Sequence, residues 1–186
     1  HKKYNEETYD GFYRRFNQEE NFPEIAGKDV RAYFNFNTEE GESIEIKFAL
    51  SSVNTDGALK NLRAEIPHWD FNKTKAETQV KWNEELSKIN VTTLSLDDKR
   101  TFYSALYHTN LSPIIYEDVD GKYRGLDQNI HSSQGFTNYS IFSLWDTYRA
   151  LHPLFNITQT ERNNDMIKSM LAHHDESVHN MLPIWS

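Results

Sequence analysis

The chain of 186 residues contains no cysteine. Disulfides, thiolate nucleophiles, iron–sulfur clusters and cysteine-ligated zinc are therefore all excluded from it. Glycine and proline are scarce, at 7 and 5 residues, so the chain is neither collagen-like nor of low complexity. A chain without thiols suits the cytosol, the periplasm and the exterior alike, so cysteine usage does not fix the compartment.

Long apolar runs and clustered positive charge are also missing. No window approaches the roughly 20 apolar residues of a membrane-spanning helix, and the start, His1-Lys2-Lys3, lacks the apolar core of a signal peptide. The sequence has 20 Lys+Arg against 28 Asp+Glu, a net charge of −8, with no basic block. We therefore expect no membrane span in this segment and no nucleic acid as a partner.

Aromatic residues are abundant at 13% of the chain, and their rings either fill a core or line pockets that hold sugars. Alternating apolar residues over 30–36 and 44–50 predict a hairpin around the polar loop 38–42, and 12–16 is typical of a further strand. Such a hairpin has one apolar face and needs more sheet to cover it. We expect the covering strands to lie outside this sequence.

Helical spacing dominates after Ser51. The pattern predicts helices at about 55–66 and 71–89, a third from Ser95 to Pro113, a fourth at 144–155, and a fifth after Thr158. Three sets of residues fit capping boxes: Ser95 with Asp98, Ser143 with Asp146, and Thr158 with Glu161. The stretch 114–142 reads as a long loop, and a loop of that length is often functional. The fold class is therefore mixed α and β.

Trp145, Asp146 and Arg149 begin the fourth expected helix. In one interpretation Asp146 only completes the capping box or pairs with Arg149 on the helix surface. In the other, the Trp145 ring and the Asp146 carboxylate grip a pyranose, with the acid accepting hydrogen bonds from neighbouring hydroxyls. The sequence alone leaves both interpretations open.

Two further clusters have simpler interpretations. The run Asp118-Val119-Asp120-Gly121 resembles a calcium loop only superficially, because the EF-hand spacing fails, and it is more typical of a solvated turn. His173, His174 and His179 lack the His-Glu-x-x-His spacing of a zinc site, and histidines are favoured near a helix end by its dipole. We expect no metal at either cluster.

Several blocks, in order, resemble glycoside hydrolase family 92, the exo-acting α-mannosidases. They read NLRAEIPHWDF (61–71), FYSALYHT (102–109), DVDGKYRG (118–125), FSLWDTYRALHP (142–153) and LPIW (182–185). The resemblance runs from about Ser43 to the end of the chain. It implies a longer enzyme in which an N-terminal β-sandwich packs on an (α/α)6 barrel, with the active site between them.

The resemblance also implies a division of this chain. Residues 1–52 correspond to the C-terminal part of the β-sandwich, 53–94 to a helical linker, and 95–186 to the start of the (α/α)6 barrel catalytic domain. The chain is then an internal portion of the enzyme. Its expected location is periplasmic, outer-membrane-associated or secreted.

Family members depend on calcium and invert the anomeric configuration, so they use an acid and a base on opposite faces of the sugar. The resemblance places the general acid, the base and the calcium ligands beyond Ser186, so no catalytic residue is expected here. Substrate contacts carry over to Trp145 and Asp146, with Arg149 as an orienting partner of Asp146. Arg124, Asp127 and Trp185 are weaker candidates from matching blocks. The expected partner is a mannose-containing oligosaccharide or glycoprotein glycan.

The alternative is a non-catalytic carbohydrate-binding or protein-interaction module. An interaction module would use the uncovered strand edge of the expected hairpin to pair with a partner's strand. Acidic residues in the sequence that follows Trp185 would favour the enzyme over both of these.

Overall fold

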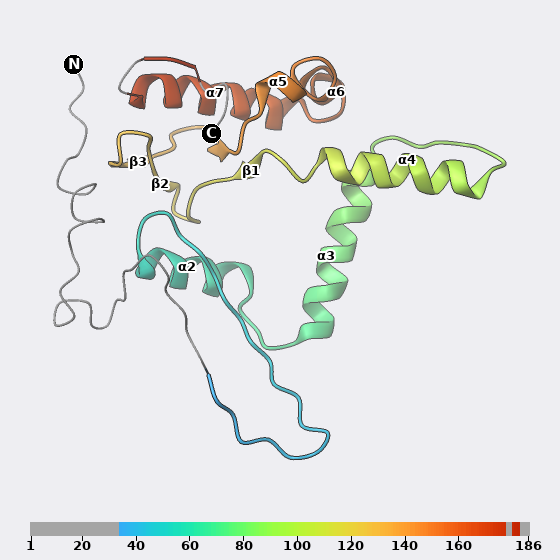
Figure 1. Ribbon diagram of the computed structural model, residues 1–186, viewed down its shortest axis with the longest axis vertical. Coiled ribbons are helices and arrows are strands. Elements are labelled where there is room, and N and C mark those ends of the chain that lie inside the picture. Colours follow the sequence, from blue (N-terminus) through green and yellow to red (C-terminus); the bar gives the residue numbers. More distant parts are fainter. Residues whose placement is uncertain (1–33, 178–179, 183–186) are drawn as a thin grey trace.

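The computed structural model describes residues 34–177 and 180–182, which form helices and two small sheets (Figure 1). The mixed fold class expected from the sequence is confirmed at this level. The expected strand at 12–16 and the first part of the hairpin, 30–33, lie outside the described residues. No described helix combines the length and apolarity needed to cross a membrane.

The described part of the expected hairpin, residues 34–50, forms no strand. It turns at Glu39–Glu42, where the Glu42 amide donates to the Glu39 carbonyl at 3.1 Å, and this turn extends away from the helices (Figure 1). The returning part is attached through Lys47, which donates to the Ile66 and His68 carbonyls at 3.0 and 3.1 Å. Its apolar side chains are exposed, Phe48 by 79% and Leu50 by 81%. The prediction of paired strands is therefore wrong over 34–50, because the residues 66–71 that lie beside 44–47 leave this face largely exposed and no described strand covers it.

Two helices follow, as the periodicity predicts. Helix α2 spans Thr55–Glu65 and begins at Asn54, whose side chain accepts from the Gly57 amide at 2.8 Å. Helix α3 spans Phe71–Leu86 and ends short of the expected Ile89. The Ile89 carbonyl instead accepts a hydrogen bond from the Tyr103 hydroxyl of the next helix at 3.1 Å.

Helix α4, Leu96–Thr109, begins where its expected capping box lies. The Ser95 hydroxyl accepts from the Asp98 amide at 3.1 Å. Only Leu106 of this helix is buried, and Leu96 at its start is 62% exposed. Within the described residues this helix therefore leaves apolar side chains on its surface.

The stretch 114–142 is ordered by two antiparallel pairs of short strands, so the expectation of a long loop is wrong. Strands β1 (Ile114–Ile115) and β4 (Tyr139–Ser140) pair, and between them β2 (Lys122–Arg124) pairs with β3 (Ile130–Ser132). In register, Ile115 lies opposite Tyr139 and Tyr123 lies opposite His131. These strands are too short to show alternation, which is why the pattern missed them.

The expected helix 144–155 is two helices, α5 (Leu144–Thr147) and α6 (Leu151–Thr158). Pro153 explains the break, because it has no N–H and its ring clashes with the carbonyl four residues earlier in a continuous helix. A new helix starting at Leu151 places Pro153 in its first turn, where both defects are tolerated.

Helix α7, Thr160–Glu176, packs against α6 and β4 and closes the core. Gln159 precedes it without a capping side chain, and the Thr158 hydroxyl donates to the Leu154 carbonyl at 3.1 Å, so the expected Thr158–Glu161 capping box is wrong. The core cluster consists of Tyr139, Phe142, Phe155 and Met166, with Leu151 and Met170 packed against it.

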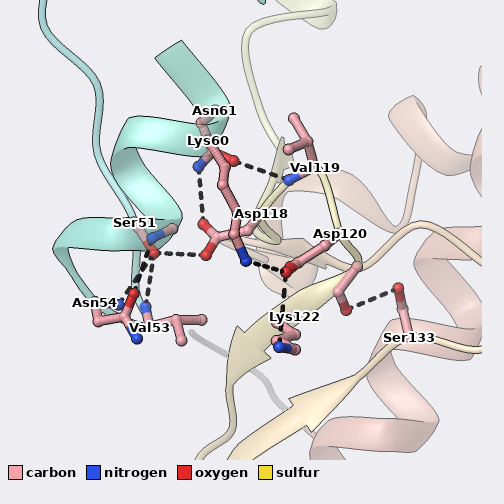
Figure 2. Close-up of polar contacts among 12 residues, drawn as sticks. Ser51, Val53, Asn54, Lys60, Asn61, Asp118, Val119, Asp120, Lys122 and Ser133 are labelled. Atoms are coloured by element: carbon pink, nitrogen blue, oxygen red, sulfur yellow. Dashed lines mark hydrogen bonds and ion pairs between the residues drawn. The ribbon is translucent and has the colours of Figure 1, made fainter. Parts of the chain in front are cut away.

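A buried carboxylate joins α2 to the β2–β3 hairpin (Figure 2). Asp118 is 4% exposed and accepts hydrogen bonds from the Ser51 hydroxyl at 2.7 Å and the Asn61 amide at 2.8 Å. Asn61 in turn accepts from the Val119 amide at 2.9 Å. The approach is so close that a Cβ on Gly57 would lie 2.2 Å from an Asp118 oxygen. The interpretation of Asp118 as part of a solvated turn is wrong.

We predict that Asp118→Ala in the protein that contains this chain lowers the opening free energy of α2 by about 3 kcal/mol. It removes two charge-assisted hydrogen bonds and leaves two polar partners in a poorly hydrated space. Hydrogen exchange of the α2 amides measures the change. Asp120→Ala is the control, because Asp120 pairs with Lys60 and Lys122 at the surface. Equal loss of protection in both variants would contradict the prediction.

Candidate substrate-binding site

Trp145 and Asp146 lie on α5, a short distance along the chain from Phe142, which is anchored in the core. Phe142 is 1% exposed and belongs to the core cluster, whereas the Trp145 side chain three residues later is 68% exposed. Asp146 is also exposed, and its amide donates to the Ser143 carbonyl at 3.0 Å. The segment therefore holds its backbone rigidly while presenting an aromatic ring and a carboxylate to solvent.

Ser143 and Asp146 contact each other through their side chains. The Ser143 hydroxyl donates to Oδ2 of Asp146, and Ser143 makes no side-chain hydrogen bond to the helix backbone. The prediction that they form a capping box is therefore wrong, although the two residues do interact. Among the described residues no group donates to Oδ1 of Asp146, so one oriented carboxylate oxygen faces solvent.

Arg149 contacts Tyr148. Its Nε donates to the Tyr148 hydroxyl at 2.7 Å, and its guanidinium lies 5.4 Å from the centre of that ring. In the described part of the chain Asp146 is oriented by Ser143, whereas the Nε of Arg149 is directed to the Tyr148 hydroxyl. Arg149 remains beside the Trp145–Asp146 pair in sequence, and it adds an exposed cation to the same segment.

The guanidinium of Arg124, on β2, donates hydrogen bonds to three backbone carbonyls of this chain. Its Nε donates to the Ser52 carbonyl at 2.9 Å, one terminal nitrogen to the Gln128 carbonyl at 2.9 Å, and the other to the Val53 carbonyl at 3.2 Å. These bonds tie the segment before α2 to the hairpin. Arg124 therefore has a structural role whether or not it also contacts substrate.

Asp127 lies in the turn between β2 and β3 and is 6% exposed. It accepts from the Asn129 amide at 3.0 Å, the Asn129 side chain at 2.9 Å and the His131 ring nitrogen Nε2 at 2.9 Å. Burial acts to raise the pKa of this carboxyl, but the hydrogen bonds from Asn129 and His131 outweigh it, and the pKa lies below its ordinary value. Asp127 is held as a buried carboxylate.

A second buried carboxylate, Glu176, attaches the end of α7 to the same hairpin. It is 7% exposed and accepts from the Tyr123 hydroxyl at 2.6 Å, and His131 Nδ1 lies 3.6 Å from the same oxygen. Burial and the Glu176 hydrogen bond raise the pKa of Tyr123. A Cβ on Gly125 would lie 2.7 Å from both Glu176 Oε2 and the His131 ring, so the backbone approaches this cluster closely.

Sequence reasoning missed Glu176, Tyr123 and His131 as a connected group, because 53 residues separate Tyr123 from Glu176. The only local signal is the four-residue spacing of Asp127 and His131.

Of the histidines considered as a cluster, His173 is 4% exposed and its ring lies edge-on 5.7 Å from Phe142. Burial lowers its pKa, as expected for a core residue. His179 lies outside the described residues.

The expected site residues thus divide into two groups. Trp145, Asp146 and Arg149 share one exposed segment, whereas Arg124 and Asp127 belong to the hairpin and have internal partners. Trp185 lies outside the described residues. Their contacts with a sugar stay predictions.

We predict that the Asp127 turn is sensitive to acid. Because the folded pKa of Asp127 lies below its ordinary value of 3.8, the stabilisation it contributes is complete at neutral pH and is lost as the pH falls below about 4. Hydrogen exchange of residues 122–132, corrected for intrinsic rates, should show this loss, and Asp127→Asn should reduce it. Asp97→Asn, at an exposed position on α4, should behave like the parent. The same acid loss in the Asp127 variant would contradict this.

The family model for the glycosyl hydrolase family 92 catalytic domain matches residues 57–186. Among solved structures, the chain is similar to the family GH92 α-mannosidase BT3965 from Bacteroides thetaiotaomicron, with 52% identity and a TM-score of 0.70 over 73% of this chain. It is also similar to the inverting mannosidase BT2199 of the same family and organism, with 28% identity and a TM-score of 0.68 over 73% of this chain.

A curated relative from Arthroderma benhamiae, described as an uncharacterized secreted glycosidase, is 33% identical over 110 residues, which is 57% of this chain. The chain spans 13% of that protein and 18% of each Bacteroides structure. The match of the family model covers most of the chain, and it includes the exposed Trp145–Asp146 segment and the three buried carboxylates Asp118, Asp127 and Glu176. The chain belongs to glycosyl hydrolase family 92.

Proposed function

We propose that this chain is an internal part of an exo-acting, inverting, calcium-dependent α-mannosidase that removes terminal α-mannose from mannose-containing oligosaccharides or glycoprotein glycans. Membership of the family and the similarity to two α-mannosidase structures support the reaction class. The description of one relative as an inverting mannosidase supports the stereochemistry.

The observation that carries the proposal is the exposed Trp145–Asp146 pair. A flat ring packs well against the C–H face of a pyranose, and a carboxylate accepts charge-assisted hydrogen bonds from its hydroxyls. Ser143 orients the Asp146 carboxylate, and the anchoring of Phe142 limits the movement of the segment. A preorganised site can bind the distorted sugar of the transition state more tightly than the relaxed sugar of the ground state. Binding energy used in this way lowers the barrier to the reaction.

The acid and base of an inverting glycosidase lie about 6.5 to 9.5 Å apart, with room for water between them. The buried acids of this chain are unsuited to that task, because Asp118, Asp127 and Glu176 each accept hydrogen bonds that hold elements together. We therefore place the general acid and base beyond Ser186, in the remainder of the enzyme. The role of this chain is to bind and orient the sugar.

The calcium of the proposed enzyme does not fit the residues described here. They contain no group of three His, Asp or Glu side chains arranged to hold a metal ion. Asp118 is bonded by Ser51 and Asn61, and Asp120 pairs with Lys60 and Lys122, so the one calcium-like run of the sequence is committed to other contacts. We place the ligands in the remainder of the protein.

We propose the domain division 1–52, 53–94 and 95–186 for the end of a β-sandwich, a linker, and the start of an (α/α)6 barrel. The change from irregular chain to helices at Thr55 and the break between α3 and α4 support these boundaries.

We propose a periplasmic, outer-membrane-associated or secreted location, which the description of the fungal relative as secreted supports. The match to a catalytic-domain model favours the enzyme over a non-catalytic module.

We predict that Asp146→Ala in the full-length enzyme lowers kcat/KM for aryl α-mannosides by about 10²- to 10⁴-fold. The carboxylate would lose two charge-assisted hydrogen bonds to the distorted sugar, at about 1.5 to 3 kcal/mol each. The melting temperature should change little, because Asp146 is exposed and its contact is with Ser143. Ser143→Ala should have a smaller effect in the same direction, since it removes only the orienting hydroxyl.

Asn54→Ala is the matched control for loss of stability. Asn54 caps α2 through the Gly57 amide, so its loss should cost about 1 kcal/mol of stability and leave kcat/KM unchanged. If Asp146→Ala resembles Asn54→Ala, with kcat/KM within about threefold of the parent, the substrate role of Asp146 is wrong.

We predict that chelation of calcium abolishes activity of the full-length enzyme and that added calcium restores it. Asp120→Asn should leave the calcium concentration for half-maximal activity unchanged, because Asp120 is paired with two lysines and is no ligand in this proposal. A shifted calcium midpoint in Asp120→Asn would instead place a ligand in this chain.

A further inference from the structure

A trough runs between α3 and the junction of α6 with α7. Its first part is a cavity of about 230 Å³ lined by Thr78, Lys81, Trp82, Glu85, Asn110 and Arg162. A second cavity of about 330 Å³ shares Glu85 and Arg162 with the first and continues to residues 158–161. We call the two together the α3 trough. No residue of the Trp145–Asp146 segment lines it.

An aromatic platform lies in the first cavity. The ring of Trp82 is half-buried, and its centre lies 4.5 Å from that of Tyr107 on α4, at an interplanar angle of 52°. Tyr107 therefore supports the indole, which restricts its motion. A restricted ring beside side chains that can hydrogen-bond is a surface on which a sugar ring can pack.

Opposite charges stand on different helices across the trough without forming an ion pair with each other. Glu85 on α3 pairs with Lys88 at 2.8 Å, and a terminal nitrogen of Arg162 on α7 donates to the Asn110 side chain at 3.4 Å. A ligand between them would meet an acceptor on one side and a donor on the other. Such a pair suits a vicinal diol, whose hydroxyls both donate and accept.

The charges of the trough are nearly balanced. The cations Lys81, Lys88 and Arg162 and the anions Glu85 and Glu161 line the two cavities, with charges of both signs on α3 and on α7. A site for phosphate or a polyanion needs a clear excess of positive charge, which is missing from these lining residues. The balance therefore favours an uncharged, hydrogen-bonding ligand.

Three threonine hydroxyls add acceptors. Thr78, Thr158 and Thr160 each donate their hydroxyl hydrogen to the carbonyl four residues earlier, at 2.8, 3.1 and 3.0 Å. Their hydrogens are therefore used, and their oxygens can accept only from a ligand that brings its own O–H or N–H groups. A polyol supplies such donors, whereas an apolar molecule would leave these oxygens unsatisfied.

We propose that the α3 trough is a second sugar subsite, in which a pyranose unit of a mannose-containing glycan packs on Trp82 and its hydroxyls bridge Glu85 and Arg162. This proposal rests on the proposed function for the identity of the glycan. The subsite binds a part of the polymer that is not cleaved. It therefore raises the affinity for long or branched substrates and does not take part in the reaction itself.

The test compares a long and a short substrate in the full-length enzyme. Trp82→Leu and Glu85→Gln should each raise KM for yeast mannan by about fivefold or more. Both should leave kcat/KM for an aryl α-mannoside unchanged, because that substrate is too short to reach the trough. Glu84→Gln is the matched control, since Glu84 is the exposed neighbour of Glu85 and does not line the trough. Trp82 also packs on Tyr107, so Glu85→Gln decides the result if Trp82→Leu fails to fold.

Electrophoresis in native gels that contain yeast mannan gives a readout independent of catalysis. Each Glu→Gln change alters the net charge, so retardation is taken as the mobility with mannan relative to the mobility of the same variant without it. By this measure the parent and Glu84→Gln should be retarded more than Trp82→Leu and Glu85→Gln. Equal KM values and equal retardation for parent and Glu85→Gln would overturn the proposal. If the enzyme cleaves no α-mannoside, the proposed function fails, whereas retardation that depends on Glu85 still supports the subsite.

Discussion

Two buried carboxylates hold this part of the molecule together by hydrogen bonds to opposite sides of one hairpin. Asp118, just before β2, accepts from Ser51 in the segment before α2 and from Asn61 of α2, and Glu176, the last residue of α7, accepts from Tyr123 of β2. A buried carboxylate without donors is costly, so each position is stable only when its partners are in place. The β2–β3 hairpin therefore determines where α2 and α7 lie relative to each other.

The proposed substrate-binding segment, Trp145 and Asp146, depends on this arrangement indirectly. Helix α7 contacts β4, where the Ser169 hydroxyl accepts from the Tyr139 amide at 2.9 Å, and Phe142 follows directly in the core. Trp145 and Asp146 come next in the chain, on a helix of four residues that has little stability of its own. The core beneath them fixes their exposed position. The proposed sugar site needs such support, because the short helix alone would move when a sugar binds.

The sequence predicted what depends on local spacing and missed what depends on contacts between distant segments. The caps at Asn54 and Ser95 and the starts of α2, α3 and α4 follow from residues within one turn. The break before α6 was signalled by Pro153, but the helical periodicity on both sides concealed it. Within the candidate site Trp145 and Asp146 are exposed, and their contact with a sugar stays a prediction. The internal roles of Arg124 and Asp127 could not be predicted, because their partners do not follow from spacing.

The separation of Asp118 from its partners also bears on the order of folding. Ser51 and Asn61 lie 67 and 57 residues before it, whereas the caps of α3 and α4 act over three residues. Closing a loop costs entropy that grows with its length, and contacts of high sequence separation are generally made after local ones. The helices α3 and α4 fall inside the loop that Asp118 closes. They can therefore form while α2 is still free, and the attachment of α2 completes the structure.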